Sequence, residues 1–256
     1  MTFLDGITVS IYCSLHAPFR NGQDERSPSF PSGERMTLQD KLDAFKVAFE
    51  TDQLPFKLAA QDHALMREAI QAQIASGITE CALTVGDAAP GFILPDSENR
   101  PCSSAALLAK GPLVISFYRG VWCPYCTLDL QALQAALPAI THNGAQLVAI
   151  SPQSAVHNRQ AARDHDLTFP LLSDAGNRLA AQFGLRYRLP DALLALYQQR
   201  LGLDLAQFNQ DDSWTLPLPA RFVITPDGRI AYAEAHADYT RRPEPQALLS
   251  VLEGLA

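Results

Sequence analysis

The chain has 256 residues, of which 47% are hydrophobic and 18% are charged. This composition fits one large globular domain or two small ones, and it excludes a peptide hormone or a disulfide-stapled miniprotein. Twenty basic against 27 acidic residues give a formal net charge of −7. Because no basic stripe is present, neither nucleic acid nor an anionic membrane is expected as the main partner.

No membrane segment or disulfide scaffold is predicted. The sequence contains no run of about 18 apolar residues, and residues 1–19 lack a basic start and an unbroken apolar stretch, which argues against a signal peptide. Five cysteines are too few for a disulfide scaffold, and they favour a cytoplasmic location. In a reducing compartment, a close cysteine pair suggests redox or metal chemistry.

The first 80 residues divide into two segments. Residues 1–35 are expected to be a flexible arm, since residues 21–35 are rich in Ser, Pro, Gly and charge and show no period. Alternatively, the arm holds an extra strand, or Met36 is the true start. Residues 36–80 are expected to form a helical N-terminal extension.

Two amphipathic patterns support this extension. Thr37 and Asp40 have the spacing of a capping box, and apolar residues follow at steps of four, three and four: Leu38, Leu42, Phe45 and Phe49. A second helix is predicted over residues 62–76, before Gly77 at the position of a C-cap.

From residue 81 onward, strands alternate with helices. Residues 85–95 read as a turn and a short edge strand. Buried strands are predicted over 113–118 and 146–151, and a hairpin over 221–233. Helices are predicted over 126–137, 155–165, 177–183, 191–201 and 244–255. Residues 81–256 therefore predict one α/β domain whose sheet is covered on both faces.

The residues that carry chemistry are Cys123 and Cys126, which form a Cys-x-x-Cys between the strand at 113–118 and the next helix. A helix N-terminus carries partial positive charge and unpaired N–H groups, which lower a cysteine pKa from its free value of about 8.5. The second cysteine lies one turn along and can close a disulfide. No second cysteine pair or spaced histidines complete a zinc site, so no metal or cofactor is expected.

Five segments of the chain resemble the peroxiredoxin family, also called the alkyl hydroperoxide reductase/thiol-specific antioxidant family, in the branch that keeps Cys-x-x-Cys. They are Val85–Pro95, Phe117–Cys126, Val148–Pro152, Phe169–Asp174 and Phe222–Gly228. The resemblance spans about residues 83–254. It implies a thioredoxin-like fold, peroxide reduction by a cysteine, and recycling by thioredoxin or another thiol.

The order of the two cysteines stays open. The active-site motif of the peroxiredoxin family is Pro-x-x-x-Thr-x-x-Cys, and the family also keeps an arginine further along the chain. When the chain is aligned to this pattern, the reactive cysteine is Cys126. The proline of the motif then corresponds to Arg119, and the distant arginine corresponds to Pro219. Trp122-Cys123 resembles thioredoxin instead and makes Cys123 the attacker. In that register Pro219 stands where thioredoxins keep a cis-proline against the disulfide.

Supporting roles follow from these registers. Arg119 either lowers a thiol pKa and orients a peroxide oxygen or is a solvated loop charge. Trp122 either shields the cysteine pair or has only a packing role in the protein. Arg241 and Arg242 are interpreted as a surface ion pair in preference to a substitute for the distant arginine. Cys81 and Cys102 are expected to be structural.

The sequence thus predicts a thiol-dependent peroxidase that takes a hydroperoxide and is recycled by a thioredoxin-like or small-thiol reductant. The alternatives are a thioredoxin-like protein disulfide oxidoreductase and a non-enzymatic redox-sensing module. The 36–80 extension offers a surface for a partner or for a homodimer, and the sequence does not choose between them.

Overall fold

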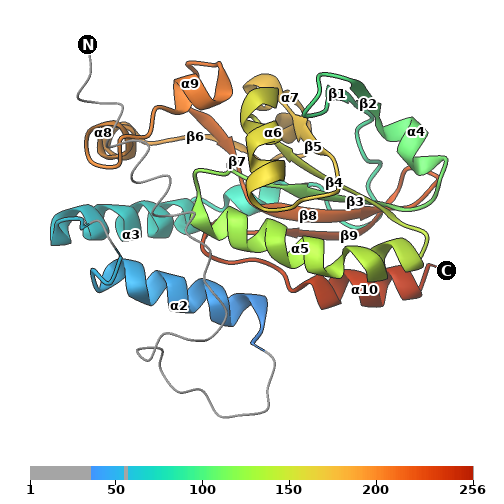
Figure 1. The fold of residues 1–256 in the computed structure, drawn as a ribbon, viewed down its shortest axis with the longest axis horizontal. Coiled ribbons are helices and arrows are strands. Elements are labelled where there is room, and N and C mark those ends of the chain that lie inside the picture. The colour runs from blue at the N-terminus through green and yellow to red at the C-terminus, as the bar shows by residue number, and fades with distance from the viewer. Residues whose placement is uncertain (1–35, 55–56, 256) are drawn as a thin grey trace.

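The computed structural model describes residues 36–54 and 57–255 (Figure 1). The arm expected over residues 1–35 lies outside the described residues, as does Cys13. Within the described ranges, none of the helices combines the length and the apolar character that crossing a bilayer requires.

The strands and helices of the described residues have the following bounds, in chain order within each kind. The strands are β1 (Ile93–Pro95), β2 (Pro101–Ser103), β3 (Leu113–Phe117), β4 (Gln146–Ser151), β5 (Leu171–Ser173), β6 (Arg186–Arg188), β7 (Thr215–Pro217), β8 (Ala220–Ile224) and β9 (Ile230–Ala235). The helices are α2 (Leu38–Glu50), α3 (Ala60–Ala75), α4 (Ser104–Leu108), α5 (Pro124–His142), α6 (Ala155–Asp164), α7 (Arg178–Gln182), α8 (Asp191–Gln199), α9 (Leu205–Asn209) and α10 (Pro245–Glu253).

The central sheet has the strand order β5-β4-β3-β8-β9. Strands β3, β4 and β5 run parallel, while β8 and β9 pair antiparallel to their neighbours. Every residue of β3 is buried, which explains its continuous apolar run, because both faces of this central strand are covered. The sheet is therefore the mixed, doubly covered sheet of a thioredoxin-like α/β fold, as predicted.

Alternate side chains of β3 enter two separate hydrophobic clusters. Val114 joins the cluster on the face covered by α5, α6 and α10, whereas Ile115 and Phe117 join the cluster that includes residues of α7. Helices α5 and α10 pack against each other and run side by side in Figure 1. This arrangement leaves the N-terminus of α5 at the carboxyl end of β3, where the cysteine pair stands.

The predicted N-terminal helices are both present. Thr37 Oγ1 accepts a hydrogen bond from Asp40 N at 3.1 Å, and Thr37 N donates to Asp40 Oδ2 at 2.9 Å, which completes the expected capping box. The buried face of α2 packs against α5, and α3 packs near α8 (Figure 1). The buried residues of this layer, Leu38, Leu42, Phe45, Leu58 and Ile70, belong to the same cluster as Val114.

Differences from the predicted elements are confined to short segments and to helix ends. Helix α5 starts at Pro124, two residues earlier than predicted, and continues past Pro138 to His142. Proline at the first helical position is favourable because its fixed φ suits a helix and its missing N–H has no intrahelical partner there. The predicted helices over 155–165, 177–183, 191–201 and 244–255 and the hairpin over 221–233 are confirmed within one or two residues.

Candidate active site

A tight loop links β3 to α5 and presents the two cysteines. Cys123 is the N-cap of α5, and Cys126 lies in its first turn. Gly120 has φ +147°, and a Cβ there would lie 2.3 Å from Trp122 Nε1. The loop therefore requires glycine at this position, because any other residue would strain the backbone and displace the indole ring.

Both cysteines are buried and next to each other. Cys123 is 2% exposed and Cys126 is fully buried, and a hydrogen bond links the two side chains. Three N–H groups point at the sulfurs. Arg119 N lies 3.4 Å and Arg242 Nη2 3.1 Å from Cys126 Sγ, while Arg119 Nη1 lies 3.7 Å from Cys123 Sγ. The pair is thus the expected adjacent one at a helix start, and both of its side chains are buried.

The charges around the pair favour one thiolate and one thiol. Burial acts to raise the pKa of Cys123, but the hydrogen bond from Cys126 and the charges of Arg119 and Arg242 outweigh it and lower that pKa to about 5. Burial raises the pKa of Cys126, and the neighbouring Cys123 raises it further. These opposite pKa shifts favour a Cys123 thiolate that accepts a hydrogen bond from the Cys126 thiol.

An aromatic cage holds the guanidinium of Arg119. Its Cζ lies 4.1 Å from the ring centroid of Tyr239, 4.9 Å from Trp122 and 5.9 Å from Tyr197. Arg119 Nη2 also donates a hydrogen bond to Tyr197 Oη at 2.6 Å. The side chain is 1% exposed, so Arg119 is not the solvated loop charge that the sequence left open. Its fixed positive charge stabilises a nearby anion.

A second buried arginine corrects the sequence interpretation. Arg242 was expected on the surface, yet it is 5% exposed and contacts Cys126 Sγ, while Arg241 is exposed. Arg242 Nε lies 3.4 Å from Asp129 Oδ2, and the same carboxylate pairs with buried Arg221. The surface interpretation of Arg242 was wrong because the chain after β9 folds back across the start of α5, which no local pattern reveals.

A small cavity opens against Cys123. Its volume is about 50 Å³, and its wall includes Arg119, Trp122, Cys123 and Tyr125 from the loop and the start of α5. Other elements complete it: Phe45 and Phe49 from α2, Met66 from α3, Tyr197 from α8, and Leu201, Leu203, Pro124 and Tyr239. Cys126 is not among the lining residues. The sequence missed Tyr197, Tyr239 and the α2 residues because each is distant along the chain.

Pro219 differs from the expectation. No peptide bond among the described residues is cis, so the bond before Pro219 is trans and the predicted cis-proline is wrong. Pro219 stands between β7 and β8, and its carbonyl accepts a hydrogen bond from His236 N at 3.0 Å. It does not line the cavity at Cys123. The structure therefore brings together Arg119, Trp122, Cys123 and Cys126, but not Pro219.

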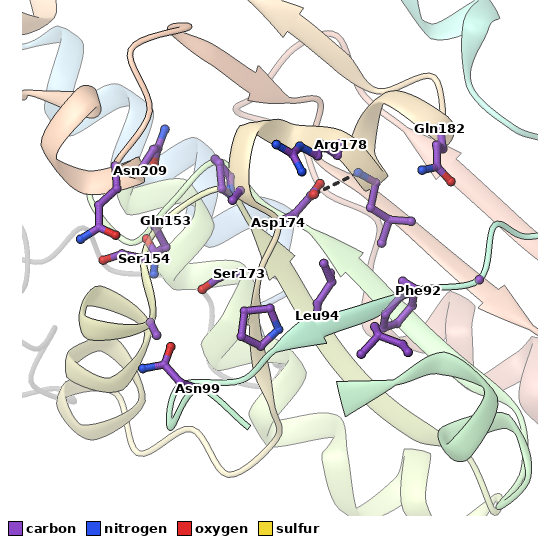
Figure 2. A pocket seen from close by; sticks show the side chains of 18 residues that line it. Phe92, Leu94, Asn99, Gln153, Ser154, Ser173, Asp174, Arg178, Gln182 and Asn209 are labelled. Atoms are coloured by element: carbon purple, nitrogen blue, oxygen red, sulfur yellow. Dashed lines mark hydrogen bonds between the residues drawn. The ribbon is translucent and has the colours of Figure 1, made fainter. Parts of the chain in front are cut away.

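A larger cavity of about 520 Å³ lies beyond the carboxyl ends of β4 and β5 (Figure 2). Asp174 stands in its wall and accepts hydrogen bonds from the N–H groups of Leu179 and Ala180 at the start of α7. Gln153 lines it too, and its Oε1 accepts from Val121 N in the loop before Cys123 at 2.9 Å. None of the cysteines that the structure describes borders this cavity, and Cys123 lines the smaller one, so the sulfur chemistry is assigned to the smaller cavity.

No metal centre is evident in the part of the chain that the structure describes, where no group of three or more His, Cys, Asp or Glu side chains could hold an ion. The chemistry available at the smaller cavity is that of its own sulfurs. A thiolate that borders a small cavity, with a thiol one helical turn away, can attack a small electrophile and then close a disulfide.

Fold and site together define a thioredoxin-like α/β protein with a dithiol at the start of the helix that follows the central strand. The family model described as "AhpC/TSA family" matches residues 85–233, which is more than half of the chain. The chain therefore belongs to the AhpC/TSA family of peroxiredoxins, and the resemblance to this family that the sequence showed is confirmed.

Relatives of known name agree with this assignment. The chloroplastic peroxiredoxin Q of Sedum lineare is 34% identical over 103 residues, which cover 40% of this chain and 55% of the relative. The chloroplastic peroxiredoxin Q of Oryza sativa subsp. japonica is 31% identical over 100 residues, covering 39% and 46%. The chain thus spans about half the length of these relatives.

A solved structure supports the fold. The crystal structure of peroxidoxin BcpB from Mycobacterium tuberculosis superimposes with a TM-score of 0.54 at 24% identity and covers 68% of this chain and 99% of that one. Helices α2 and α3 precede the residues that the family model matches.

Proposed function

We propose that this protein is a thiol peroxidase in which Cys123 is the nucleophile and Cys126 the resolving partner. The observation that carries the proposal is the cavity at Cys123, which has in its wall a side chain with a pKa lowered to about 5, beside a buried guanidinium. Family membership supplies the reaction class, because AhpC/TSA proteins of the relatives' kind are named peroxiredoxins.

The reaction balances within the pair and one external reductant. The Cys123 thiolate attacks one oxygen of ROOH, the O–O bond breaks, and RO⁻ leaves and takes up a proton to become ROH. Cys123 becomes a sulfenic acid. The Cys126 sulfur then attacks Cys123 Sγ, an S–S bond forms and water leaves. A dithiol reductant returns two electrons and two protons, and it leaves as a disulfide.

Access to the cavity favours Cys123 over Cys126 as the nucleophile. The contacts to Cys126 Sγ, at 3.1 and 3.4 Å, are shorter than the 3.7 Å contact to Cys123 Sγ and would also support a thiolate. A nucleophile must also meet its substrate, however, and only Cys123 borders the cavity. Arg119 stabilises the anion in this scheme, and Trp122 closes the wall next to it.

A protein disulfide is a poorer substrate for this conformation. Cys123 is 2% exposed in this conformation, so a disulfide on another protein meets it less readily than a small peroxide that enters the cavity. A disulfide oxidoreductase is therefore the second candidate, favoured by Trp122 next to Cys123. Insulin reduction compared with peroxide turnover separates the two activities. A cytoplasmic location remains a prediction that cell fractionation would test.

The decisive assay follows NADPH consumption with thioredoxin, thioredoxin reductase and hydrogen peroxide, with a small dithiol tested as an alternative reductant. We expect Cys123→Ser to abolish turnover and Cys126→Ser to accumulate a sulfenic acid that dimedone traps on Cys123. Cys81→Ser is the matched control, because Cys81 is exposed and away from the cavity. Unchanged turnover in the double variant of Cys123 and Cys126 would refute the proposal.

A further inference from the structure

The cavity at Cys123 is closed in part by helices that lie outside the family-model match. Phe45 and Phe49 of α2 and Met66 of α3 line it, and all three precede residue 85, where the match begins. Phe45 packs edge-on against Tyr125 with ring centroids 5.1 Å apart, and Phe49 packs against His63 at 4.9 Å. The extension is therefore part of the substrate cavity of this chain.

Helix α2 is held in place by the segment that also reaches the sulfurs. Glu244 accepts hydrogen bonds from Gln39 N at 2.8 Å and Leu38 N at 3.0 Å, so its carboxylate occupies the positive end of α2. Gln39 Oε1 in turn accepts from Arg242 N at 3.4 Å, and the Arg242 side chain contacts Cys126. This anchoring fixes the aromatic wall relative to the two sulfurs.

The size of the cavity restricts what can approach the thiolate. A water molecule needs roughly 10–15 Å³ of such space, so a cavity of about 50 Å³ holds only a few non-hydrogen atoms. Hydrogen peroxide is small enough for this volume. Cumene hydroperoxide carries a phenyl ring and exceeds it, so we expect the wall that Phe45, Phe49 and Met66 form to limit its approach.

We infer that α2 and α3 set the substrate range of this site, and that Phe49 and Met66 are specificity-determining residues that limit it to hydrogen peroxide and the smallest alkyl hydroperoxides. This inference rests on the proposed function and names its substrate class. Phe45 shares this role. It is only 7% exposed and is more buried than Phe49, so its truncation would also destabilise the hydrophobic core.

Steady-state assays of kcat/KM for hydrogen peroxide and for cumene hydroperoxide test the inference. We expect wild type to prefer hydrogen peroxide. Phe49→Ala and Met66→Ala should each raise the ratio of cumene to hydrogen peroxide kcat/KM by about tenfold or more. Val47→Ala is the matched control on α2, since Val47 is 56% exposed and does not line the cavity, and it should keep the wild-type ratio.

A second measurement reports on the cavity without peroxidase activity. Peptide mass spectrometry gives the alkylation rates of Cys123 by iodoacetamide and by a bulky maleimide, and Phe49→Ala should speed the bulky reagent selectively. Circular dichroism confirms that each variant is folded. Should Phe49→Ala fail to fold, Phe49→Leu replaces it and is expected to shift both ratios in the same direction by less.

The outcomes separate the two proposals. Wild type that reduces both peroxides equally well, or folded Phe49 and Met66 variants with unchanged ratios, would overturn the role of the extension and leave the peroxidase intact. Wild type that reduces neither peroxide would refute the proposed function and, with it, the substrate range. In that case the alkylation ratios would still show whether the cavity sorts reagents by size.

Discussion

At the scale of single residues, the ionisation of the cysteine pair depends on nearby charges that the sequence predicted only in part. The helix N-terminus was expected to lower a thiol pKa, and Cys123 is indeed the N-cap of α5. The structure adds two buried guanidinium groups, Arg119 and Arg242, at the sulfurs. Arg242 shares the buried carboxylate of Asp129 with Arg221, whereas Arg119 is held by aromatic side chains, so the net charge next to the sulfurs is positive and favours a thiolate.

A pH titration of the thiolate tests whether the pKa of Cys123 is lowered in this way. Because the pKa of Cys123 is lowered to about 5, the thiolate should be present at neutral pH and disappear only as the pH falls through about 5. A free cysteine would titrate near 8.5 instead. The ultraviolet absorbance of the thiolate, with Cys123→Ser as the blank, measures the midpoint.

Arg119→Met should move that midpoint upward, because it removes a positive charge that lowers the pKa of Cys123. Arg163→Met is the control, since Arg163 is exposed in the last turn of α6 and should leave the midpoint unchanged. A wild-type midpoint above pH 8 would contradict the proposed thiolate at Cys123.

At the scale of elements, three segments meet at one carboxylate. Asp129 of α5 pairs with Arg221 of β8 and with Arg242, which precedes α10, and all three side chains are almost fully buried. Arg221 Nη1 also donates a hydrogen bond to Pro243 O at 2.9 Å. The cluster thus ties the helix that carries the cysteines to the sheet and to the C-terminal segment.

Asp129→Asn tests this tie. The substitution leaves two buried guanidinium groups without an anionic partner, so the free energy of unfolding should fall by about 3–5 kcal/mol. Urea denaturation measures the change. Glu253→Gln, at an exposed position at the end of α10, should alter stability by no more than about 0.5 kcal/mol. A loss below about 1 kcal/mol in Asp129→Asn would show that the cluster is not a stabilising junction.

Sequence patterns predicted the long elements well and the short ones unevenly, since α7 was predicted although it has only five residues. Helices α2, α3, α6 and α10 carry an apolar period or a cap, and β3 and β4 carry long apolar runs, so all were predicted near their observed bounds. Strands β6 and β7 and helices α4 and α9 are three to five residues long, too short to show a period. They were therefore not predicted.

The site was predictable only as far as its local motif. Arg119, Trp122, Cys123 and Cys126 lie within eight residues and could be named from the sequence. Arg242 meets Cys126 across 116 residues of chain, and Tyr197 meets Arg119 across 78. Such long-range contacts depend on how helices pack, which no local pattern encodes.

At the scale of the whole molecule, the extension and the α/β domain share one hydrophobic cluster. Leu38, Leu42 and Phe45 of α2 belong to the same cluster as Val114 of β3 and Leu130 of α5. The sequence predicted the extension and the α/β domain as separate regions. We expect them to unfold together, because the separation of one from the other would expose the apolar surface that they share.

Two spectroscopic probes test this cooperativity. Both tryptophans, Trp122 and Trp214, lie outside the extension, while far-ultraviolet circular dichroism includes α2 and α3. Urea unfolding curves from tryptophan fluorescence and circular dichroism should coincide. Leu42→Ala should shift both curves together by about 2–5 kcal/mol, whereas Val47→Ala should shift neither strongly. An earlier dichroism transition would mean that the extension unfolds alone.

The position of Cys126 within the first turn of α5 bears on how the protein would withstand an excess of oxidant. On the proposed chemistry, an oxidised Cys123 already has its partner sulfur beside it, because the two side chains are hydrogen-bonded in the reduced pair. Ring closure then competes with over-oxidation without any helix having to unwind. The sulfinic acid should therefore accumulate slowly in this protein, and it should appear readily once the neighbouring sulfur is removed.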